Sequence, residues 1–279
     1  GKTTICNLIP RFYDIDSGDI KIDSQNTSFY TDEKGVIYNA SKTKLLMAPN
    51  LSGEFVVPDT VEYISPGSFS YRKNISKIVI GKNVTEIGEN AFYYCSGITE
   101  FIFEDGGTAD LVIGNGALRN CSKITSIVLP NRTKTIDTYA FGSCSSLANI
   151  VLPEGLTEIG DSCFVYCSKL ITLNIPSTLV KLGTYSLGDT SSQVKAFDYL
   201  NNLEKVNVSE NNPVFVSDNG ILYAKNNNVA TSLCFVPKAF AGDLILPKTI
   251  NKIGKGAFKN NSKITSISFA DNMSACVLD

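Results

Sequence analysis

Apolar residues recur along most of this chain in a pattern that repeats about every 23 positions. Each unit begins with an L/I-x-x-I-x-I/L segment, in which the apolar side chains share one face, as in Ile124, Ile127 and Leu129. Alternation with a period of two is typical of a β-strand with one buried face. A turn with Pro, Gly or Asn follows, then a second short strand such as TEIG at 85–88, and then a tight helical turn that ends in Phe and Cys-Ser.

Four consecutive units align, at 75–97, 98–123, 124–146 and 147–169, and all have the same length except the second, which is longer. A fifth begins at Leu170 and runs long before the next begins at Leu203. One unit cannot bury its own apolar face, but stacked units share a continuous core. The pattern therefore predicts a mainly β solenoid with short helical turns. The stretches 98–123 and 183–202 fit the pattern poorly, and we expect bulges there.

Two longer segments bracket this array and match each other. Residues 20–39 align with residues 206–224, and both have an Asp and a Gly before an apolar run, which is typical of a β-hairpin. We expect a hairpin between the first and second strands of the units near 20–74 and 203–263, projecting through Tyr38 and Tyr223 as a second candidate surface. The last unit, 264–279, is truncated, and we expect the chain to be a piece of a longer one because repeat arrays need capping units.

The unit LxxIxIPxxVxxIGxxAFxxCSS and its hairpin-bearing DxxGVLY variant resemble the BspA-like leucine-rich repeats of bacterial surface proteins over about residues 20–270. This resemblance implies a right-handed leucine-rich-repeat solenoid in a secreted or cell-surface protein. It implies adhesion to a protein ligand on a host cell, in the matrix or on a neighbouring cell. No cofactor is expected.

The opening stretch at 1–23, GKTTICNLIPRFYDIDSGDIKID, does not follow the repeat. It is similar to the end of the phosphate-binding loop, and the stretch after it, in the nucleotide-binding domains of ABC transporters. This similarity implies that Lys2 would hold phosphate oxygens and Thr3 would ligate magnesium. Nothing later in the sequence completes such a site. We expect residues 1–19 to be a foreign fragment and not an independent domain, with residues 20–279 forming the solenoid, and a nucleotide-binding remnant stays a remote alternative.

The composition argues against catalysis. The 279 residues include no His, which removes the commonest general base and metal ligand. A Ser-His-Asp or Cys-His arrangement is impossible, and no pair of carboxylates stands out. We expect neither enzyme activity nor a metal site.

Charge and hydropathy give no reason to expect binding to nucleic acid or insertion into a membrane. The net charge is −2, and the Lys and Arg residues are scattered singly, so nothing favours a nucleic-acid partner. No apolar stretch approaches the roughly 18–20 residues that cross a bilayer, so we expect no membrane insertion within this segment.

Two columns of side chains are expected inside the stack. Four of the eight cysteines share one repeat position and would form a ladder about one strand spacing, ~5 Å, apart. Their side chains would point inward in parallel, which favours buried free thiols over disulfides. They are Cys95, Cys121, Cys144 and Cys167. A second column is expected to pack in the core, and it comprises Phe69, Phe92, Phe141, Phe164 and Phe258.

The outward residues of the first strands are the candidate binding site, because repeat proteins commonly bind through an extended concave face. Val79, Ile102, Val128 and Val151 form an apolar column with a polar column beside it, and an apolar strip with a polar rim is typical of a protein-binding surface. β-branched residues also suit strands for packing reasons alone. The polar members are Lys77, Glu100, Ser126 and Asn149.

This pattern indicates a non-catalytic protein-interaction module. A carbohydrate-binding domain or a structural spacer stays open as an alternative, although the expected concave face offers no aromatic ring for a sugar.

Overall fold

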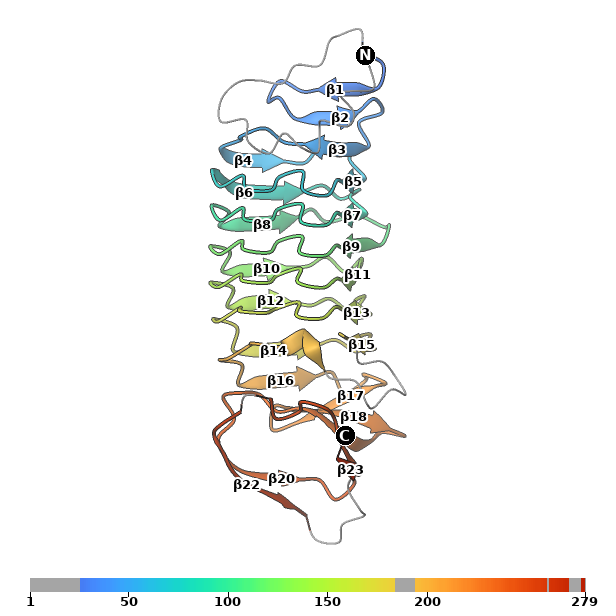
Figure 1. The fold of residues 1–279 in the computed structure, drawn as a ribbon. Coiled ribbons are helices and arrows are strands. Elements are labelled where there is room, and N and C mark those ends of the chain that lie inside the picture. Colours follow the sequence, from blue (N-terminus) through green and yellow to red (C-terminus); the bar gives the residue numbers. More distant parts are fainter. Residues whose placement is uncertain (1–25, 184–193, 260, 271–276, 279) are drawn as a thin grey trace.

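The molecule is a stack of short β coils, in which each coil contributes one strand to each of two sides (Figure 1). The computed structural model describes residues 26–183, 194–259, 261–270 and 277–278. Within them the only helix is a single 3-10 turn, η2 (Lys195–Phe197). The mainly β solenoid expected from the apolar pattern is therefore confirmed.

The first strands of the coils lie along one side of the stack. Their bounds are β4 (Gly53–Val56), β6 (Ile75–Ile80), β8 (Glu100–Phe103), β10 (Ser126–Val128), β12 (Asn149–Val151), β14 (Thr172–Ile175), β16 (Lys205–Val208), β20 (Gly242–Leu246) and β22 (Ile264–Phe269). These strands are parallel but form four separate sheets, namely β4-β6-β8, β10-β12, β14-β16 and β20-β22. The pairing between neighbouring coils is thus interrupted on this side.

The second strands of the coils are shorter and lie along another side. Their bounds are β5 (Tyr63–Ile64), β7 (Glu86–Ile87), β9 (Leu111–Ile113), β11 (Thr133–Ile136), β13 (Glu158–Ile159), β15 (Lys181–Leu182), β21 (Lys252–Ile253) and β23 (Val277–Leu278). The strands from β5 to β15 pair without interruption within one sheet of nine strands. β11 has a bulge between Thr133 and Thr135 where it faces β9, outside the stretch 98–123 for which the sequence predicted one.

Both expected hairpins are present, and each is a three-stranded antiparallel meander. The first contains β1 (Phe29–Thr31), β2 (Ile37–Asn39) and β3 (Lys44–Met47), and the second contains β17 (Phe215–Asp218), β18 (Ile221–Asn226) and β19 (Val229–Phe235). The third strand of each meander pairs in parallel with the second strand of the next coil, β5 or β21. The meanders are therefore joined to the solenoid through the second-strand side.

Tyr38 and Tyr223 do not project from these hairpins, contrary to the expectation from sequence. Their exposed fractions are 2% and 1%. The Tyr38 hydroxyl donates a hydrogen bond to Asp32 Oδ2 at 3.0 Å. Burial, followed by the charge of Asp218, raises the pKa of Tyr223 to about 12. Both rings pack inward because the hairpins need an apolar anchor against the stack, so they offer no second binding surface.

The interior includes the two expected columns beside the buried Ile, Leu and Val residues of the strands. Phe69, Phe92, Phe141 and Phe164 are buried, whereas Phe258 in the last coils is only half-buried. The rings of Phe69 and Phe92 stack with centroids 4.7 Å apart. The cysteine column is buried as free thiols, and each Sγ donates to a carbonyl of the preceding coil. The four bonds are Cys95 to Phe69 O, Cys121 to Phe92 O, Cys144 to Leu118 O and Cys167 to Phe141 O.

Candidate functional site: the first-strand face

The eight candidate residues lie together on the outward side of β6, β8, β10 and β12, and we call this surface the first-strand face. Lys77 pairs in register with Glu100 and Val79 with Ile102, and the same holds for Ser126 with Asn149 and Val128 with Val151. Alternation along each strand turns these side chains out while their neighbours fill the core. The exposed fractions of Ile102, Val128 and Val151 are 41%, 61% and 45%, and Val79 is half-buried.

The face begins one coil earlier than the sequence analysis placed it. Glu54 and Val56 of β4 pair with Lys77 and Val79 of β6, and Val56 is 46% exposed. Glu54 Oε1 lies 3.2 Å from Lys77 Nζ, which makes an exposed ion pair. The signal was available in the sequence, because each of these residues stands one repeat length before its partner. Adding Val56 extends the apolar column to five coils.

A further exposed apolar residue lies on β20, near the C-terminal end of the stack. Ile245 has an exposed fraction of 65%. Beside it, Asp243 accepts hydrogen bonds from Ser266 Oγ at 2.6 Å and Thr265 Oγ1 at 2.8 Å. These hydrogen bonds lower the pKa of the Asp243 carboxyl. The coils of β14 and β16 separate this position from the apolar column, with Asn174 and Asn207 bonded to each other at 2.9 Å.

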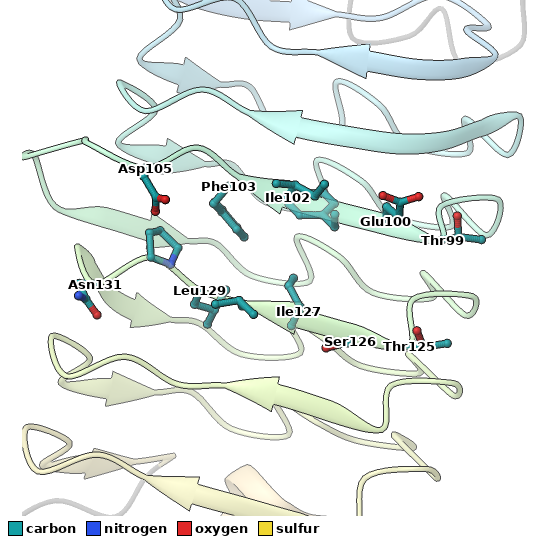
Figure 2. Close-up of a pocket in the computed structure, with 13 residues that line it drawn as sticks. Thr99, Glu100, Ile102, Phe103, Asp105, Thr125, Ser126, Ile127, Leu129 and Asn131 are labelled. Carbon is teal, nitrogen blue, oxygen red and sulfur yellow. The ribbon is translucent and has the colours of Figure 1, made fainter.

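A groove of about 580 Å³ crosses the first-strand face between β8 and β10 (Figure 2). Its apolar lining is Phe101, Ile102, Phe103, Ile127, Val128, Leu129 and Pro130. Its polar lining includes Thr99, Glu100, Asp105, Thr125, Ser126 and Asn131. The groove therefore lies at the centre of the apolar column, between Ile102 and Val128. It also brings two carboxylates, those of Glu100 and Asp105, next to the column.

The groove coincides with a break in the sheet, since β8 and β10 are not paired in the described sheets. The coil that contains β8 is longer than its neighbours. Ile80 and Ile87 are seven positions apart, whereas their partners Phe103 and Ile113 are ten apart. The additional residues lie in the connection 104–110, between β8 and β9. This coil keeps its second strand paired while its first strand separates from the following one.

The side chain of Arg132 is buried against this connection and contacts the one between β6 and β7 as well. Its side chain is 7% exposed, and its guanidinium donates to the carbonyls of Val84, Ala109 and Gly81. A Cβ on Gly107 would lie 2.6 Å from Arg132 Nε, so this glycine allows the close approach. Burial lowers the pKa of Arg132. The sequence did not predict this burial, because an Arg in a turn gives no local signal of it.

The face carries binding groups but no constellation for chemistry. Across the described ranges, no cluster of three or more His, Cys, Asp or Glu could hold a metal ion. Lys2 and Thr3, the residues named for a nucleotide, lie outside the residues that the structure describes. The arrangement can hold an apolar side chain in the groove and a cation at its carboxylate rim. No helix in the described part of the chain is long and apolar enough to cross a membrane.

The stacked parallel coils, most of which pair at the common repeat spacing, define a leucine-rich-repeat solenoid. The family model described as BspA type leucine rich repeat region matches the chain in six copies, over residues 49–110, 111–215 and 229–276. The chain belongs to this family, and the resemblance stated from the sequence is confirmed. No curated protein matches the sequence of the chain.

Solved structures show the same fold at low sequence identity. A leucine-rich cell surface protein from Faecalibacterium prausnitzii is 20% identical with a TM-score of 0.60, covering 91% of this chain and 77% of that one. The pneumococcal vaccine antigen PcpA is 20% identical with a TM-score of 0.66, covering 90% and 72%. A leucine-rich repeat protein from Eubacterium ventriosum is 22% identical with a TM-score of 0.58, covering 91% and 60%.

Proposed function

We propose that this chain is a non-catalytic protein-interaction module of a secreted or cell-surface bacterial protein. In this proposal the first-strand face binds a protein on a host cell, in the matrix or on a neighbouring cell. One observation carries the proposal, namely the groove between β8 and β10 at the centre of an exposed apolar column. Exposed apolar patches with a polar rim are typical of interaction sites.

The family supports the compartment that we propose. The chain has BspA type repeats, and one solved neighbour is described as a cell surface protein and another as a vaccine antigen. The leucine-rich-repeat fold also suits protein binding, because parallel strands present a long and regular surface. Adhesion is therefore the biological role we propose for this face.

The lining of the groove narrows the chemistry of the partner. Glu100 and Asp105 bring two carboxylates to its rim, while Ile102 and Val128 provide exposed apolar contacts. A partner segment with an apolar side chain next to Lys or Arg would satisfy both features. Rim charges mainly steer association and set specificity, whereas the apolar contact in the centre of an interface contributes most of the affinity.

The test places a charge in the column and measures binding to a panel of immobilised matrix and host-surface proteins. We expect Val128→Asp with Val151→Asp to weaken binding to the captured protein at least tenfold, because two carboxylates would be desolvated in the interface. The matched control is Val229→Asp on the second hairpin, because Val229 is 44% exposed and Val151 is 45% exposed. Circular dichroism should show all variants folded.

Two results would contradict the proposal. Binding that persists unchanged in the folded double variant would mean that the first-strand face is not the binding surface. Absence of binding to every protein of the panel would favour a structural spacer.

A further inference from the structure

A row of exposed tyrosines lies on the turn side of the stack, away from the first-strand face. The turn side is formed by the tight turns that connect the second strand of one coil to the first strand of the next. These residues share one repeat position, directly before the cysteine position. They are Tyr71, Tyr94, Tyr166 and Tyr199, with exposed fractions of 49%, 39%, 53% and 42%. Asn120 and Ser143 occupy the same position in the two coils between the pairs. The row thus consists of two tyrosine pairs separated by two small polar residues.

The backbone at this position is left-handed, with φ near +60° in all six coils. Values are 63° for Tyr71, 57° for Tyr94, 60° for Tyr166 and 60° for Tyr199. Gly and Asn tolerate this conformation best, whereas another L-residue is destabilised by about 1–2 kcal/mol. A ring that stays about half exposed regains little of this by burial. Strained residues whose rings pack on one another at the surface, and not in the core, point to a functional use of the side chain.

Three rings of the N-terminal pair and its neighbour form a rigid surface, which we call the tyrosine ledge, consisting of Tyr71, Tyr93 and Tyr94. The rings of Tyr71 and Tyr94 are nearly parallel, with centroids 5.5 Å apart and planes at 12°. Tyr93 meets both rings edge-on, with centroids at 5.4 Å and 4.8 Å. Mutual packing therefore fixes the orientation of the ledge before any ligand arrives.

The second pair is as exposed as the first, but one of its rings already has cations against it. Lys238 and Lys259 place their ammonium groups 5.3 Å and 5.7 Å from the ring centre of Tyr199. Such cation–π contacts occupy a ring face that a ligand would need. At the ledge, the guanidinium of Arg119 approaches Tyr93 from a longer distance of 6.0 Å. The N-terminal pair is therefore the better candidate for binding.

A hollow of about 270 Å³ adjoins the ledge and supplies polar groups. Tyr71 and Tyr93 line it together with Glu89, Asn90 and Ser70. Asn90 Nδ2 lies 3.4 Å from Glu89 Oε1, and the Ser70 hydroxyl donates to the backbone carbonyl of Asn90 at 2.8 Å. An exposed carboxylate accepts hydrogen bonds and an amide both donates and accepts them. Aromatic rings and these polar groups thus meet in one small hollow.

We propose that the tyrosine ledge and this hollow form a carbohydrate-binding site that takes a pyranose ring of a glycan. The C–H face of a pyranose packs on an aromatic ring, and its hydroxyls match the carboxylate of Glu89 and the amide of Asn90. The volume lies below the roughly 300–1,000 Å³ of pockets for drug-sized ligands, so it fits one sugar unit.

The test uses the full chain and an array of host-type and bacterial oligosaccharides, with saturation-transfer NMR on the bound glycan. We expect at least one glycan to bind and its pyranose C–H protons to receive saturation. The variant Tyr71→Asn with Tyr94→Asn should weaken this binding at least tenfold. It should fold at least as well as the parent, because Asn120 shows that asparagine suits the left-handed position. Glu89→Gln, which keeps the shape of the side chain, should weaken binding several-fold.

The matched control is Tyr166→Asn, the same substitution at the same repeat position in the other pair, and it should leave glycan binding unchanged. The proposal is overturned if no glycan binds, if the double variant binds as well as the parent, or if Tyr166→Asn loses binding equally. A ledge variant that loses a protein ligand while no glycan binds would identify a protein site instead. The Val128→Asp and Val151→Asp variant should keep glycan binding, so the two proposals fail separately.

Discussion

The first-strand side and the second-strand side of the same coils differ in how neighbouring coils are joined. On the second-strand side, β5 to β15 pair without a break, whereas the first strands separate after β8 and after β12. The turn side is also continuous, with bonds such as Phe92 N to Ala117 O and Leu118 N to Ala140 O, both 2.8 Å. The second-strand side, the turn side and the interior therefore hold the coils together, whereas strand pairing on the first-strand side can differ from one coil to the next.

This difference explains where the groove and the exposed apolar residues occur. The second strands stay paired across the longer coil because the connection 104–110 contains the additional residues before β9 begins. A side that need not pair can open instead, as between β8 and β10. Unit length is not the only cause, because β12 and β14 also separate although their coils keep the common repeat spacing.

The largest expected effect comes from breaking the interior that all sides share. Phe92 stacks on Phe69 at 4.7 Å and meets Phe101 of β8 edge-on at 5.1 Å. Phe92→Ala should lower the free energy of unfolding by about 3–5 kcal/mol, because it leaves a cavity between two coils. Urea denaturation measures the change. The half-buried Phe258 offers the control, and an equal loss for Phe258→Ala would mean that the interior does not dominate.

A smaller effect is expected at the corner behind the groove. Arg132→Met keeps the stem but removes the guanidinium donor from the carbonyls of Val84 and Ala109, while the Gly81 carbonyl still accepts from Val84 N at 3.2 Å. Unpaired buried polar groups are destabilising, so we expect a loss of about 1–3 kcal/mol. Faster amide exchange should appear in β7 and β9, which follow the segments that the guanidinium joins, but not in β15.

The neighbouring Lys134 gives the control for Arg132. Its Nζ lies 3.9 Å from Asp110 Oδ1 in an exposed pair. Lys134→Met should change stability by less than about 0.5 kcal/mol. A loss as large as that of Arg132→Met would contradict a special role for the buried guanidinium.

Alkaline pH should weaken the interior without acting on the first-strand face. Burial raises the pKa of Cys95 and of Cys144 to about 12. An unfolded thiol titrates near pH 8.5, so the unfolded chain releases protons first and stability falls as pH rises from about 9 towards 12. The slope is at most about 1.4 kcal/mol per pH unit for each thiol.

Melting temperatures between pH 7.5 and pH 10, in a reducing buffer, measure this loss. Cys144→Ala removes one titrating thiol, so its melting temperature should fall less steeply with pH than that of the parent. Parallel curves for the two chains would show that the ladder does not control the alkaline transition.

The smallest effect is expected on the first-strand face itself. Lys77 Nζ lies 3.2 Å from Glu54 Oε1, and both side chains are substantially exposed. Exposed ion pairs contribute about 0–1 kcal/mol, so Lys77→Ala should leave stability within about 0.5 kcal/mol of the parent. A loss in urea denaturation well above the contribution of an exposed pair, about 1 kcal/mol, would show that this side helps to hold the stack after all.

The sequence by itself determined the coil, its interior and the residues that share a face. Strand alternation is a local property, and a constant spacing sets the register between coils, so Val128 and Val151 had to lie side by side. The same reasoning placed the cysteine thiols and four of the five phenylalanines in the core.

Only the tertiary structure decided which coils pair, because pairing depends on the spacing between coils and not on the residues of one strand. The same holds for the groove between β8 and β10, the burial of Arg132 and the inward rings of Tyr38 and Tyr223. The exposed tyrosines repeat in the sequence before the cysteines, at Tyr94 and Tyr166, yet only the folded backbone shows their left-handed conformation. The repeat period and the alternation of apolar residues are properties of the sequence along the chain. The groove and the exposed tyrosine rings, in contrast, depend on how neighbouring coils pack against each other.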